Sequence, residues 1–430
     1  MSRGAAAAPP PLPRGTRVVV EAERVAHGGH VVARHEGRVV FVRHALPGET
    51  VEVEITGEGK GGRFLRGDAV RVLDPSPDRV EPPCPHARPG GCGGCDWQHA
   101  AVPAQRRLKA EVLREQLVRL GGLDEIDGVP VREAVDVVAV PGDRDGLAWR
   151  TRVRYAVDQD GAAGFHRHRS GRVEPVERCP LVTDELDGIG VTRLPWPGTD
   201  AVTTVASSGG DRSVVVEPAS LGRDLPRDVN VPGLRGRGWV REHAGGREWR
   251  VAADGFWQVH PGAADALVEA VREALDPQPG EHLLDLYSGV GLFAGCLAPA
   301  LGEDGQVDAV ESSARACADA RRNLHDLPGV RIHERSVASW LRWTELDSVD
   351  LVVLDPPRSG AGAEVLERVL DLAPRAIAYV ACDPAALGRD LGLVREAGWR
   401  VASVQGFDLF PMTHHLEAVA LVLPPLAGRG

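Results

Sequence analysis

The spacing of apolar and polar residues divides the chain into regions of different character. Between residues 14 and 73, short runs such as RVVVEAERVA and ETVEVEITG alternate apolar with polar positions, and turn pairs such as Gly28-Gly29 and Pro47-Gly48 separate the runs. Period-two alternation bounded by turn residues is typical of antiparallel strands. We therefore predict a small β-barrel over this region.

The pattern changes after residue 73. The segment PSPDRVEPPCP is rich in proline and indicates a linker. Beyond it, KAEVLREQLVRLGGL predicts an amphipathic helix that ends at Gly121-Gly122, whereas RTRVRYAVD and RSVVVEP predict strands. We expect residues 74–250 to form a mixed α+β central domain.

From residue 251 onward, apolar runs of strand length alternate with helical stretches. EHLLDLYS, QVDAVES, VDLVVLDPP and AIAYVAC have the nearly continuous apolar character of strands that are buried on both faces of a sheet. Strands that alternate with helices indicate an α/β domain with a mainly parallel sheet, here over residues 251–430.

Composition indicates a soluble globular protein. The chain has 430 residues, of which 43% are hydrophobic and 26% are charged, and this suits two or three domains. No apolar run approaches the roughly 18 residues that span a bilayer, so we expect no membrane association. The alanine run in MSRGAAAAPPPLPRG is too short for the core of a signal peptide. Residues 1–13 are therefore expected to be a disordered tail, and the protein to be cytoplasmic.

Charge changes this picture little. The net charge of −11 argues only weakly against a nucleic-acid partner. Arginines gather locally, for example between Arg144 and Arg172, so local basic faces exist within an acidic total.

A glycine loop follows the first strand of the α/β region. DLYSGVGLFA places Gly289 and Gly291 where the backbone turns tightly and can approach a ligand. Glu311 ends the next strand, and an acidic residue at this spacing is suited to hold ribose hydroxyls. Because the full G-x-G-x-x-G pattern is missing, a nucleoside without pyrophosphate, such as S-adenosylmethionine, fits better than a dinucleotide. The alternative is that the glycines merely reverse the chain.

An Asp-Pro-Pro-Arg segment, Asp355 to Arg358, closes the strand VDLVVLD. Ligands of open α/β sheets bind at the carboxyl ends of the strands. We therefore expect Asp355 to face the same crevice as Gly289 and Glu311. The alternative is a simple turn with a surface arginine.

A cysteine stands where a predicted strand meets a predicted helix, in YVACDPAALGRD. Asp383 suits a helix N-cap and Pro384 a first helical position, so Cys382 is expected beside a helix N-terminus. A helix N-terminus favours the thiolate and lowers the pKa of a cysteine, which suggests a nucleophile. The alternative is a buried structural thiol, as we expect for Cys296 and Cys317.

A glutamate interrupts the last apolar run, FPMTHHLEAVALV. A carboxylate in a buried strand is costly unless it is paired or functional, so Glu417 is a candidate general base with a raised pKa. The alternative is an edge-strand charge that faces water.

These motifs resemble those of the bacterial RNA uracil-5 methyltransferases, which form 5-methyluridine in ribosomal or transfer RNA. The matching segments occur in order at residues 255–260, 285–293, 355–358, 381–391 and 410–422. The resemblance covers nearly the whole chain. It implies a class I, Rossmann-like S-adenosylmethionine-dependent domain, and the N-terminal barrel resembles the TRAM domain, an RNA-binding OB-like fold. We expect RNA as the partner, no obligate protein partner, and a monomer.

The resemblance also implies roles for individual residues. The Cys382 thiolate would add to carbon 6 of uracil, carbon 5 would then accept the methyl group, and Glu417 would remove the carbon 5 proton. Asp355 would orient the base. The uridine must leave any stack to reach such a pocket. The cofactor-binding positions implied by the resemblance are Gln258, Tyr287, Gly289, Gly291, Glu311 and Asp355. His260 stands where the family motif has asparagine, which leaves its contact with the cofactor open.

Three cysteines cluster in CPHARPGGCGGC, namely Cys84, Cys92 and Cys95, and Cys179 is a candidate fourth. Close thiols in a reducing cytoplasm indicate a metal site, and both zinc and a [4Fe–4S] cluster take four cysteines. Three clustered cysteines and one distant cysteine suit a [4Fe–4S] cluster better than zinc, and the resemblance agrees. His86 and His99 are the nearest replacements if Cys179 is not a ligand. Methylation needs no electron, so the cluster is expected to be structural or to orient RNA.

Two other functions compete with this interpretation. A methyltransferase for a small molecule or an exocyclic amine would need neither the cysteine nor the glutamate. An RNA-binding protein with a degenerate methyltransferase domain would need no S-adenosylmethionine, so the absence of a rise in melting temperature with the cofactor would favour it.

Overall fold

The computed structural model describes residues 12–59, 62–218 and 238–426. Residues 1–11, most of the predicted tail, lie outside these ranges. The chain forms two compact units. Unit 1 comprises residues 1–108, 166–174 and 412–414, and unit 2 comprises residues 109–165, 175–411 and 415–430. In the described part of the chain, no helix is both long and apolar enough to cross a membrane.

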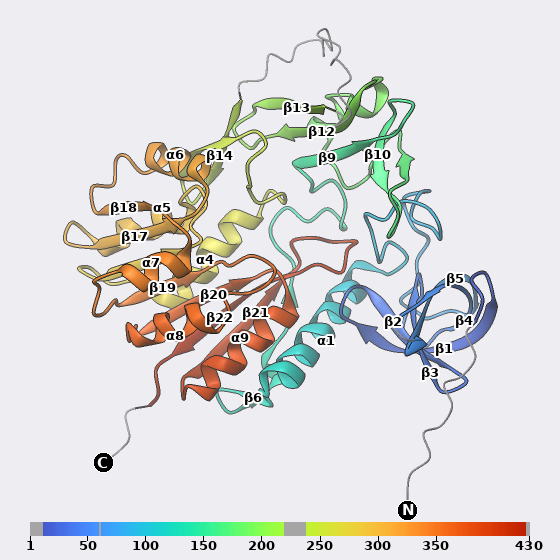
Figure 1. The fold of residues 1–430 in the computed structure, drawn as a ribbon, viewed down its shortest axis with the longest axis horizontal. Helices are drawn as coiled ribbons and strands as arrows, with labels where there is room; N and C mark the ends of the chain where they lie inside the picture. The colour runs from blue at the N-terminus through green and yellow to red at the C-terminus, as the bar shows by residue number, and fades with distance from the viewer. Residues whose placement is uncertain (1–11, 60–61, 219–237, 427–430) are drawn as a thin grey trace, which may run out of the picture. The chain divides into compact units, whose positions relative to one another are not determined.

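Unit 1 contains the predicted β-barrel. Its strands, which Figure 1 shows in blue, close in the order β1-β2-β3-β5-β4. Their bounds are β1 Arg17–Ala26, β2 His30–His35, β3 Arg38–Arg43, β4 Thr50–Glu58 and β5 Phe64–Asp74. Alternate side chains fill the interior: Val18 and Val20 are buried, whereas Val19 is 56% exposed. The period-two pattern therefore predicted both the strands and the side of each strand that faces the core.

The segment predicted as a linker is fixed to this barrel. The Arg79 guanidinium donates from Nε and Nη2 to the two carboxylate oxygens of Glu49, at 2.5 and 2.7 Å. The Glu49 side chain is fully buried and also accepts hydrogen bonds from the backbone amides of Leu46 and Ser76. Proline breaks the strand pattern here, but the ion pair holds the segment in place, so it is not a free tether.

Unit 2 begins with shorter sheets. The predicted strands RTRVRYAVD and RSVVVEP are confirmed as β9 (Arg152–Val157) and β13 (Arg212–Pro218), in an antiparallel sheet with the order β10-β9-β12-β13. A hairpin of β14 and β15 follows. The remaining bounds are β10 Ala163–His166, β11 Val173–Pro175, β12 Thr199–Ala206, β14 Trp239–Ala244 and β15 Arg247–Ala252. Short elements are β6 Glu125–Ile126, β7 Val129–Pro130, α2 Val131–Ala134, α3 Asp184–Asp187, η2 Val191–Arg193 and η3 Ala298–Leu301.

The centre of unit 2 is a sheet with the strand order β18-β17-β16-β19-β20-β22-β21-β8. Pairing from β18 to β20 is parallel, whereas β22 is antiparallel to both β20 and β21. The bounds are β8 Val137–Val138, β16 His282–Leu286, β17 Gln306–Glu311, β18 Val330–Glu334, β19 Leu351–Leu354, β20 Ala376–Ala381, β21 Arg400–Phe407 and β22 Glu417–Leu423. The predicted mainly parallel sheet is therefore confirmed.

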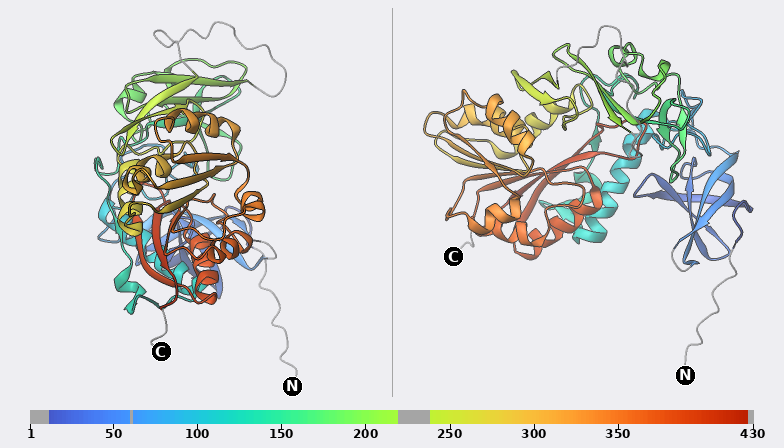
Figure 2. Two further views of the ribbon diagram at one scale, coloured as in Figure 1. Left: turned by 90° about the vertical axis from the view of Figure 1, so that its left-hand side faces the viewer. Right: turned by 45° about the horizontal axis from the view of Figure 1, so that its top comes forward.

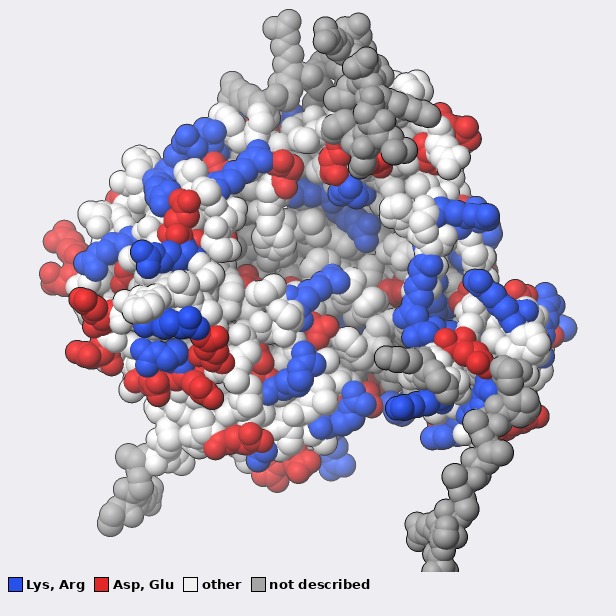
Figure 3. All heavy atoms as spheres, viewed as in Figure 1, with Lys and Arg blue, Asp and Glu red and all other residues white. Residues whose placement is uncertain are grey.

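Helices cover both faces of this sheet (Figures 1 and 2). Side chains of α1, α7, α8 and α9 pack in one apolar core with the sheet, and those of α4 and α5 pack in the other. The helix bounds are α1 Val102–Gly121, α4 Ala263–Leu275, α5 Leu292–Leu297, α6 Ala314–Asn323, α7 Val337–Trp343, α8 Ala363–Asp371 and α9 Pro384–Glu396. Lys and Arg side chains mix with Asp and Glu over the α/β part of unit 2 (Figure 3), in keeping with the acidic total.

Helix α1 ends at Gly121 as predicted, and its backbone comes close to that of α9. A Cβ atom at Gly388 would lie 2.6 Å from the Gln116 carbonyl oxygen, and one at Gly121 would lie 2.9 Å from the Gly388 carbonyl oxygen. Only glycine permits this distance between the helices. The α9 helix, which follows Cys382, is thus held by α1, a helix from the predicted central domain. The predicted boundary at residue 251 stays a prediction, since the two-unit division is coarser.

A buried ion pair also joins α1 to the end of β21. The Lys109 ammonium donates to the Asp408 carboxylate at 2.5 Å and to the Phe410 carbonyl oxygen at 3.0 Å. Both side chains are almost fully buried. Removing one partner leaves the other charge in a medium of low polarity.

We expect Lys109→Met to lower the free energy of unfolding by about 3–5 kcal/mol, because the Asp408 carboxylate would remain buried without its cation. Urea denaturation followed by circular dichroism measures this. Arg107→Met is the matched control, since Arg107 pairs with Asp78 on the surface and should contribute about 1 kcal/mol or less. An equal loss of unfolding free energy in Lys109→Met and Arg107→Met would contradict the assignment of Lys109 and Asp408 as a buried ion pair.

Candidate active site

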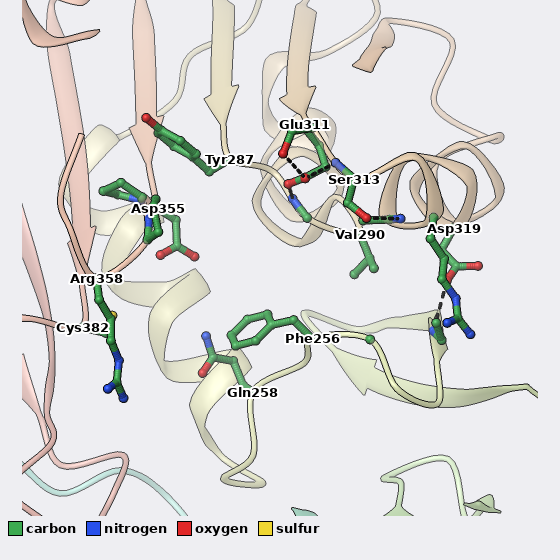
Figure 4. A pocket seen from close by; sticks show the side chains of 18 of the residues that line it. Phe256, Gln258, Tyr287, Val290, Glu311, Ser313, Asp319, Asp355, Arg358 and Cys382 are labelled. Atoms are coloured by element: carbon green, nitrogen blue, oxygen red, sulfur yellow. Dashed lines mark hydrogen bonds between the residues drawn. The ribbon is translucent and has the colours of Figure 1, made fainter. Parts of the chain in front are cut away.

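A cavity of about 770 Å³ opens at the carboxyl ends of the parallel strands of unit 2. Figure 4 shows it from close by: Asp355, Arg358 and Cys382 lie along one side, with Tyr287 and Glu311 across from Gln258. Seven residues singled out from the sequence line it, namely Gln258, Tyr287, Gly289, Glu311, Asp355, Cys382 and Glu417. The sequence motifs therefore meet at one place, where ligands of open α/β sheets bind.

The glycine loop shapes one wall of this cavity. Gly289 has a φ of +56° and Gly291 a φ of +91°, a region that residues with a Cβ rarely adopt. Gly291 is not among the lining residues; a Cβ there would lie 2.6 Å from Leu324, so its role is close packing. Glu311 accepts hydrogen bonds from the amides of Gly289 at 3.1 Å and Ser313 at 2.6 Å. Its carboxylate is thereby fixed at the rim of the cavity.

Cys382 lies where the sequence placed it, just before α9. Asp383 caps the helix by accepting a hydrogen bond from the Ala386 amide at 2.8 Å, and Pro384 is the first helical residue. The expected lowering of the thiol pKa is wrong, however. Burial, and then the negative charge of Glu417, raise the pKa of Cys382 to about 11, although the Arg358 cation opposes this. Loss of water and a neighbouring carboxylate outweigh the helix N-terminus here.

Buried Glu417 and half-buried Asp355 bring two carboxyl groups into the cavity lining. Glu417 is only 4% exposed, and it lies in β22 between two other strands, so the alternative of an edge-strand charge is wrong. Burial, and then the charge of Asp355, hold the pKa of Glu417 well above its usual range, and burial raises the pKa of Asp355 to about 7. Burial and a neighbouring carboxylate both make it harder for a carboxyl group to ionise.

Several residues at this site were not singled out from the sequence. Asp285 lies behind the lining residues rather than among them: it is fully buried, accepts a hydrogen bond from the Ala294 amide, and burial raises its pKa to about 7. Phe256 is 75% exposed at the rim, and His415 lines the cavity near Phe410. The sequence did contain a signal for these residues, because each lies inside one of the motifs described above. The motifs alone did not show which of their residues face the cavity.

His260 is not among the lining residues. Its Nδ1 accepts a hydrogen bond from the Gly262 amide at 3.1 Å, and its ring stacks on Trp149 with centroids 6.2 Å apart. Burial lowers its pKa, which keeps the ring neutral. The structure thus gives His260 a packing role.

The cysteine loop is in unit 1. The Gly94 amide lies 3.4 Å from the Cys92 sulfur, and the Gln98 side chain donates to the Cys95 sulfur at 3.1 Å. Among the residues that the structure describes, no three Cys, His, Asp or Glu side chains gather as a metal ion would require. Cys179 belongs to unit 2. The set of Cys84, Cys92, Cys95 and Cys179 therefore stays a prediction from the sequence.

The two suggested replacement ligands already have partners. His86 Nδ1 lies 3.2 Å from a Glu174 carboxylate oxygen, and His99 Nε2 lies 3.3 Å from the Ala45 carbonyl oxygen.

Known proteins place this fold and site in a family. The TRAM domain model matches residues 12–70, and the model described as tRNA (Uracil-5-)-methyltransferase matches residues 245–423. An uncharacterized RNA methyltransferase of Streptomyces avermitilis is 50% identical over 96% of this chain and 100% of its own length. One from Corynebacterium glutamicum is 35% identical over 95% of this chain and 97% of its own length.

A solved structure has the same fold. Pyrococcus abyssi tRNA (uracil-54, C5)-methyltransferase in complex with S-adenosyl-L-homocysteine matches with a TM-score of 0.66 at 21% identity, over 94% of this chain and 99% of that one. The site and these relatives define an enzyme that transfers methyl groups to RNA. The chain belongs to the family of S-adenosylmethionine-dependent RNA (uracil-5-)-methyltransferases.

The raised pKa of Cys382 predicts slow alkylation that accelerates with pH. Between pH 7 and 9 the rate with iodoacetamide should rise about tenfold per pH unit, because only the thiolate reacts. The peptide from Ala376 to Arg389 contains no other cysteine, so mass spectrometry can follow it alone. Glu417→Gln should raise the rate, since it removes a charge that raises the thiol pKa.

Cys296 is the internal control, because burial raises the pKa of its thiol to about 12 and Glu417 is not among the charges that affect it. A plateau of Cys382 alkylation below pH 8 would contradict the assignment.

Proposed function

We propose that this protein transfers a methyl group from S-adenosylmethionine to carbon 5 of a uridine in ribosomal or transfer RNA, through a covalent adduct with Cys382. The observation that supports this best is the meeting of Cys382, Glu417 and Asp355 in the lining of one cavity. Methylation of an amine needs neither a thiol nor a buried carboxylate pair beside it. S-adenosylmethionine supplies an electrophilic methyl group.

The proposed chemistry assigns one step to each side chain. The Cys382 thiolate adds to carbon 6 of the uracil, which makes carbon 5 nucleophilic enough to take the methyl group. Glu417 then removes the proton from carbon 5, and the bond between carbon 6 and sulfur breaks to release the product and restore the cysteine. A carboxylate with a raised pKa is a stronger base, which suits Glu417 to this step. Asp355 orients the base, and the target uridine must be unstacked to enter.

The cofactor is proposed to lie between the glycine loop and the opposite wall, against Gln258, Tyr287, Gly289, Glu311 and Asp355. Glu311 is the residue suited to ribose hydroxyls, because two amides already fix its carboxylate and leave lone pairs for further donors. The cavity also has room for a base beside a nucleoside cofactor.

We further propose that the barrel binds RNA through a basic aromatic strip made of Phe41, Phe64, Arg66 and His30. The Phe41 and Phe64 rings meet edge to face with centroids 5.2 Å apart, and His30 lies 6.2 Å from Phe41. The Arg66 guanidinium lies 4.7 Å above the Phe64 ring. Partly exposed rings beside a cation are the surface on which single-stranded bases stack.

For the cysteine set, we propose a [4Fe–4S] cluster with zinc as the alternative, on the sequence pattern alone. No step of methyl transfer uses it. Iron and sulfide analysis of protein purified without oxygen distinguishes the two, and the absence of both metals would end the proposal.

The reaction itself predicts a trapped intermediate. With total bacterial RNA that lacks 5-methyluridine and with S-adenosylmethionine, the protein should form 5-methyluridine, which nucleoside mass spectrometry detects. Glu417→Gln should lower turnover by about 10²–10⁴-fold, because the base is lost after the adduct has formed. The variant should therefore accumulate RNA-linked protein on a denaturing gel.

The double change Glu417→Gln with Cys382→Ala is the control and should abolish this adduct. Methylation at another atom would overturn the uracil assignment. No methylation, although the cofactor binds, would favour a protein that only binds RNA.

Substitutions in the basic aromatic strip should each weaken RNA binding in a way that can be measured separately. Phe64→Ala should weaken binding of a single-stranded oligonucleotide by about 1–3 kcal/mol, since one stacking surface is lost. Arg66→Gln should reduce the slope of log K against log salt by about one. Fluorescence anisotropy over a salt series measures both. Arg17→Gln is the matched barrel control, because Arg17 already pairs with Glu52 and Glu54, and an equal loss in it would contradict the proposal.

A further inference from the structure

A buried carboxylate outside the cavity lining connects two parts of the site. Asp390 is 4% exposed and lies about two turns after Cys382, on α9. Its Oδ2 accepts hydrogen bonds from the Tyr379 hydroxyl at 2.5 Å and from the amides of Ala361 at 2.7 Å and Gly362 at 3.3 Å. These two amides end the loop that starts at Asp355. Asp390 thus fastens that loop to the helix that follows the cysteine.

The loop has little freedom once its far end is held. Its near end continues from β19, which ends at Leu354 in the middle of the sheet. Pro356 and Pro357 fix two backbone φ angles. A turn follows, in which the Gly360 amide donates to the Pro357 carbonyl oxygen at 2.8 Å. Arg358 lies within this turn, so the two anchored ends fix the backbone from which its exposed side chain extends.

Gly360 shows how closely the loop approaches Asp390. A Cβ atom at this position would lie 2.6 Å from Asp390 Oδ2, and its φ of +89° is strained for any other residue. Helix α8 begins directly after the loop, and its cap residue, Gly362, has no side chain to satisfy the free amides. The Asp390 carboxylate, from a different helix, instead accepts from the amides of Ala361 and Gly362, the two residues just before the first residue of α8.

The loop carries the cation of the catalytic group. The positive charge of Arg358 acts on both Cys382 and Glu417, and in each case it favours the charged form. The charge of Asp390 also reaches Tyr287, a lining residue of the proposed cofactor site. A loop that shifted away from α9 would take Arg358 from the thiol.

We propose that Asp390 is a positioning residue for the methyl transfer: by clamping the Asp355–Gly362 loop to α9, it keeps Arg358 where its charge assists formation of the Cys382 thiolate. This inference rests on the proposed function, since it assumes that Cys382 is the nucleophile. It assigns Asp390 no contact with substrate. Tyr379 is the second half of the clamp, because its hydroxyl donates to Asp390 and accepts from the Ala361 amide at 3.1 Å.

The sign of the effect separates this role from a direct effect of charge. Removal of a negative charge would, by itself, ease ionisation of a nearby thiol and speed its alkylation. Loss of the clamp predicts the opposite, because Arg358 would no longer be held beside the thiol.

The test combines alkylation of Cys382 with turnover. Asp390→Ala should slow alkylation at pH 8 and lower kcat by about 10–100-fold, the usual cost of losing a group that orients a reactive one. Arg358→Gln should slow alkylation to a similar extent. In the double variant the two effects should not multiply, since Asp390 acts through Arg358. Asp390→Asn should recover most of the rate, because its carbonyl oxygen can still accept from Tyr379 and Ala361.

Two further variants keep the proposal falsifiable if Asp390→Ala fails to fold. Gly360→Ala leaves Asp390 intact but pushes the loop from it, and Tyr379→Phe removes one donor; both should slow alkylation. Glu396→Gln, an exposed change on the same helix, is the control and should have no effect.

Alkylation of Cys382 at the wild-type rate in both Gly360→Ala and Tyr379→Phe would overturn the proposed clamp. Effects on this rate that multiply when Asp390→Ala is combined with Arg358→Gln would also overturn it. Failure of the wild-type protein to methylate RNA would instead count against the proposed function, because alkylation is measured without RNA.

Discussion

Loss of water around three ionisable groups controls what this site can do. Cys382, Asp355 and Glu417 line one cavity, and burial is the largest cause that raises the pKa of each; a neighbouring carboxylate adds to it at Cys382 and at Glu417. A thiol with a pKa near 11 is almost entirely protonated at neutral pH, and a protonated thiol is unreactive. The exposed Arg358 cation opposes this rise, because its positive charge lowers the pKa of both Cys382 and Glu417.

The strand topology explains how Cys382 and Glu417 meet. Because β22 runs antiparallel to β20, Ala381 lies opposite Ala418, and the residues beyond this pair are Cys382 and Glu417. In a parallel arrangement, Glu417 would begin β22 at the amino end of β20, about 15 Å or more from Cys382. One reversed strand in a mainly parallel sheet therefore brings Cys382 and Glu417 together, and the same strand buries the glutamate.

Sequence patterns could predict the elements, and the motifs could predict which segments meet. Alternation predicted the barrel, and the apolar runs predicted the parallel strands, because both patterns record burial directly. The thiol pKa could not be predicted in the same way: the helix N-terminus beside Cys382 is visible in CDPAALG, but the loss of water and the neighbouring Glu417 depend on tertiary packing. The role of Asp390 could not be predicted from the sequence for a similar reason. An aspartate in a helix suggests a side chain that is exposed to solvent. Only the folded structure shows that this one faces the amides of a distant loop.

Helix α1 shows that the catalytic apparatus reaches beyond the segment that carries its motifs. Its backbone contacts α9 through glycines at Gly121 and Gly388, and Lys109 holds Asp408 and the Phe410 carbonyl oxygen. The first contact fixes the helix that follows the nucleophile, and the second fixes the segment that leads into Glu417. Residues of α1 from Lys109 onward accordingly group with unit 2. The packing of α1 and the geometry of the cavity are therefore linked, because a change that loosens α1 moves the segments that carry Cys382 and Glu417.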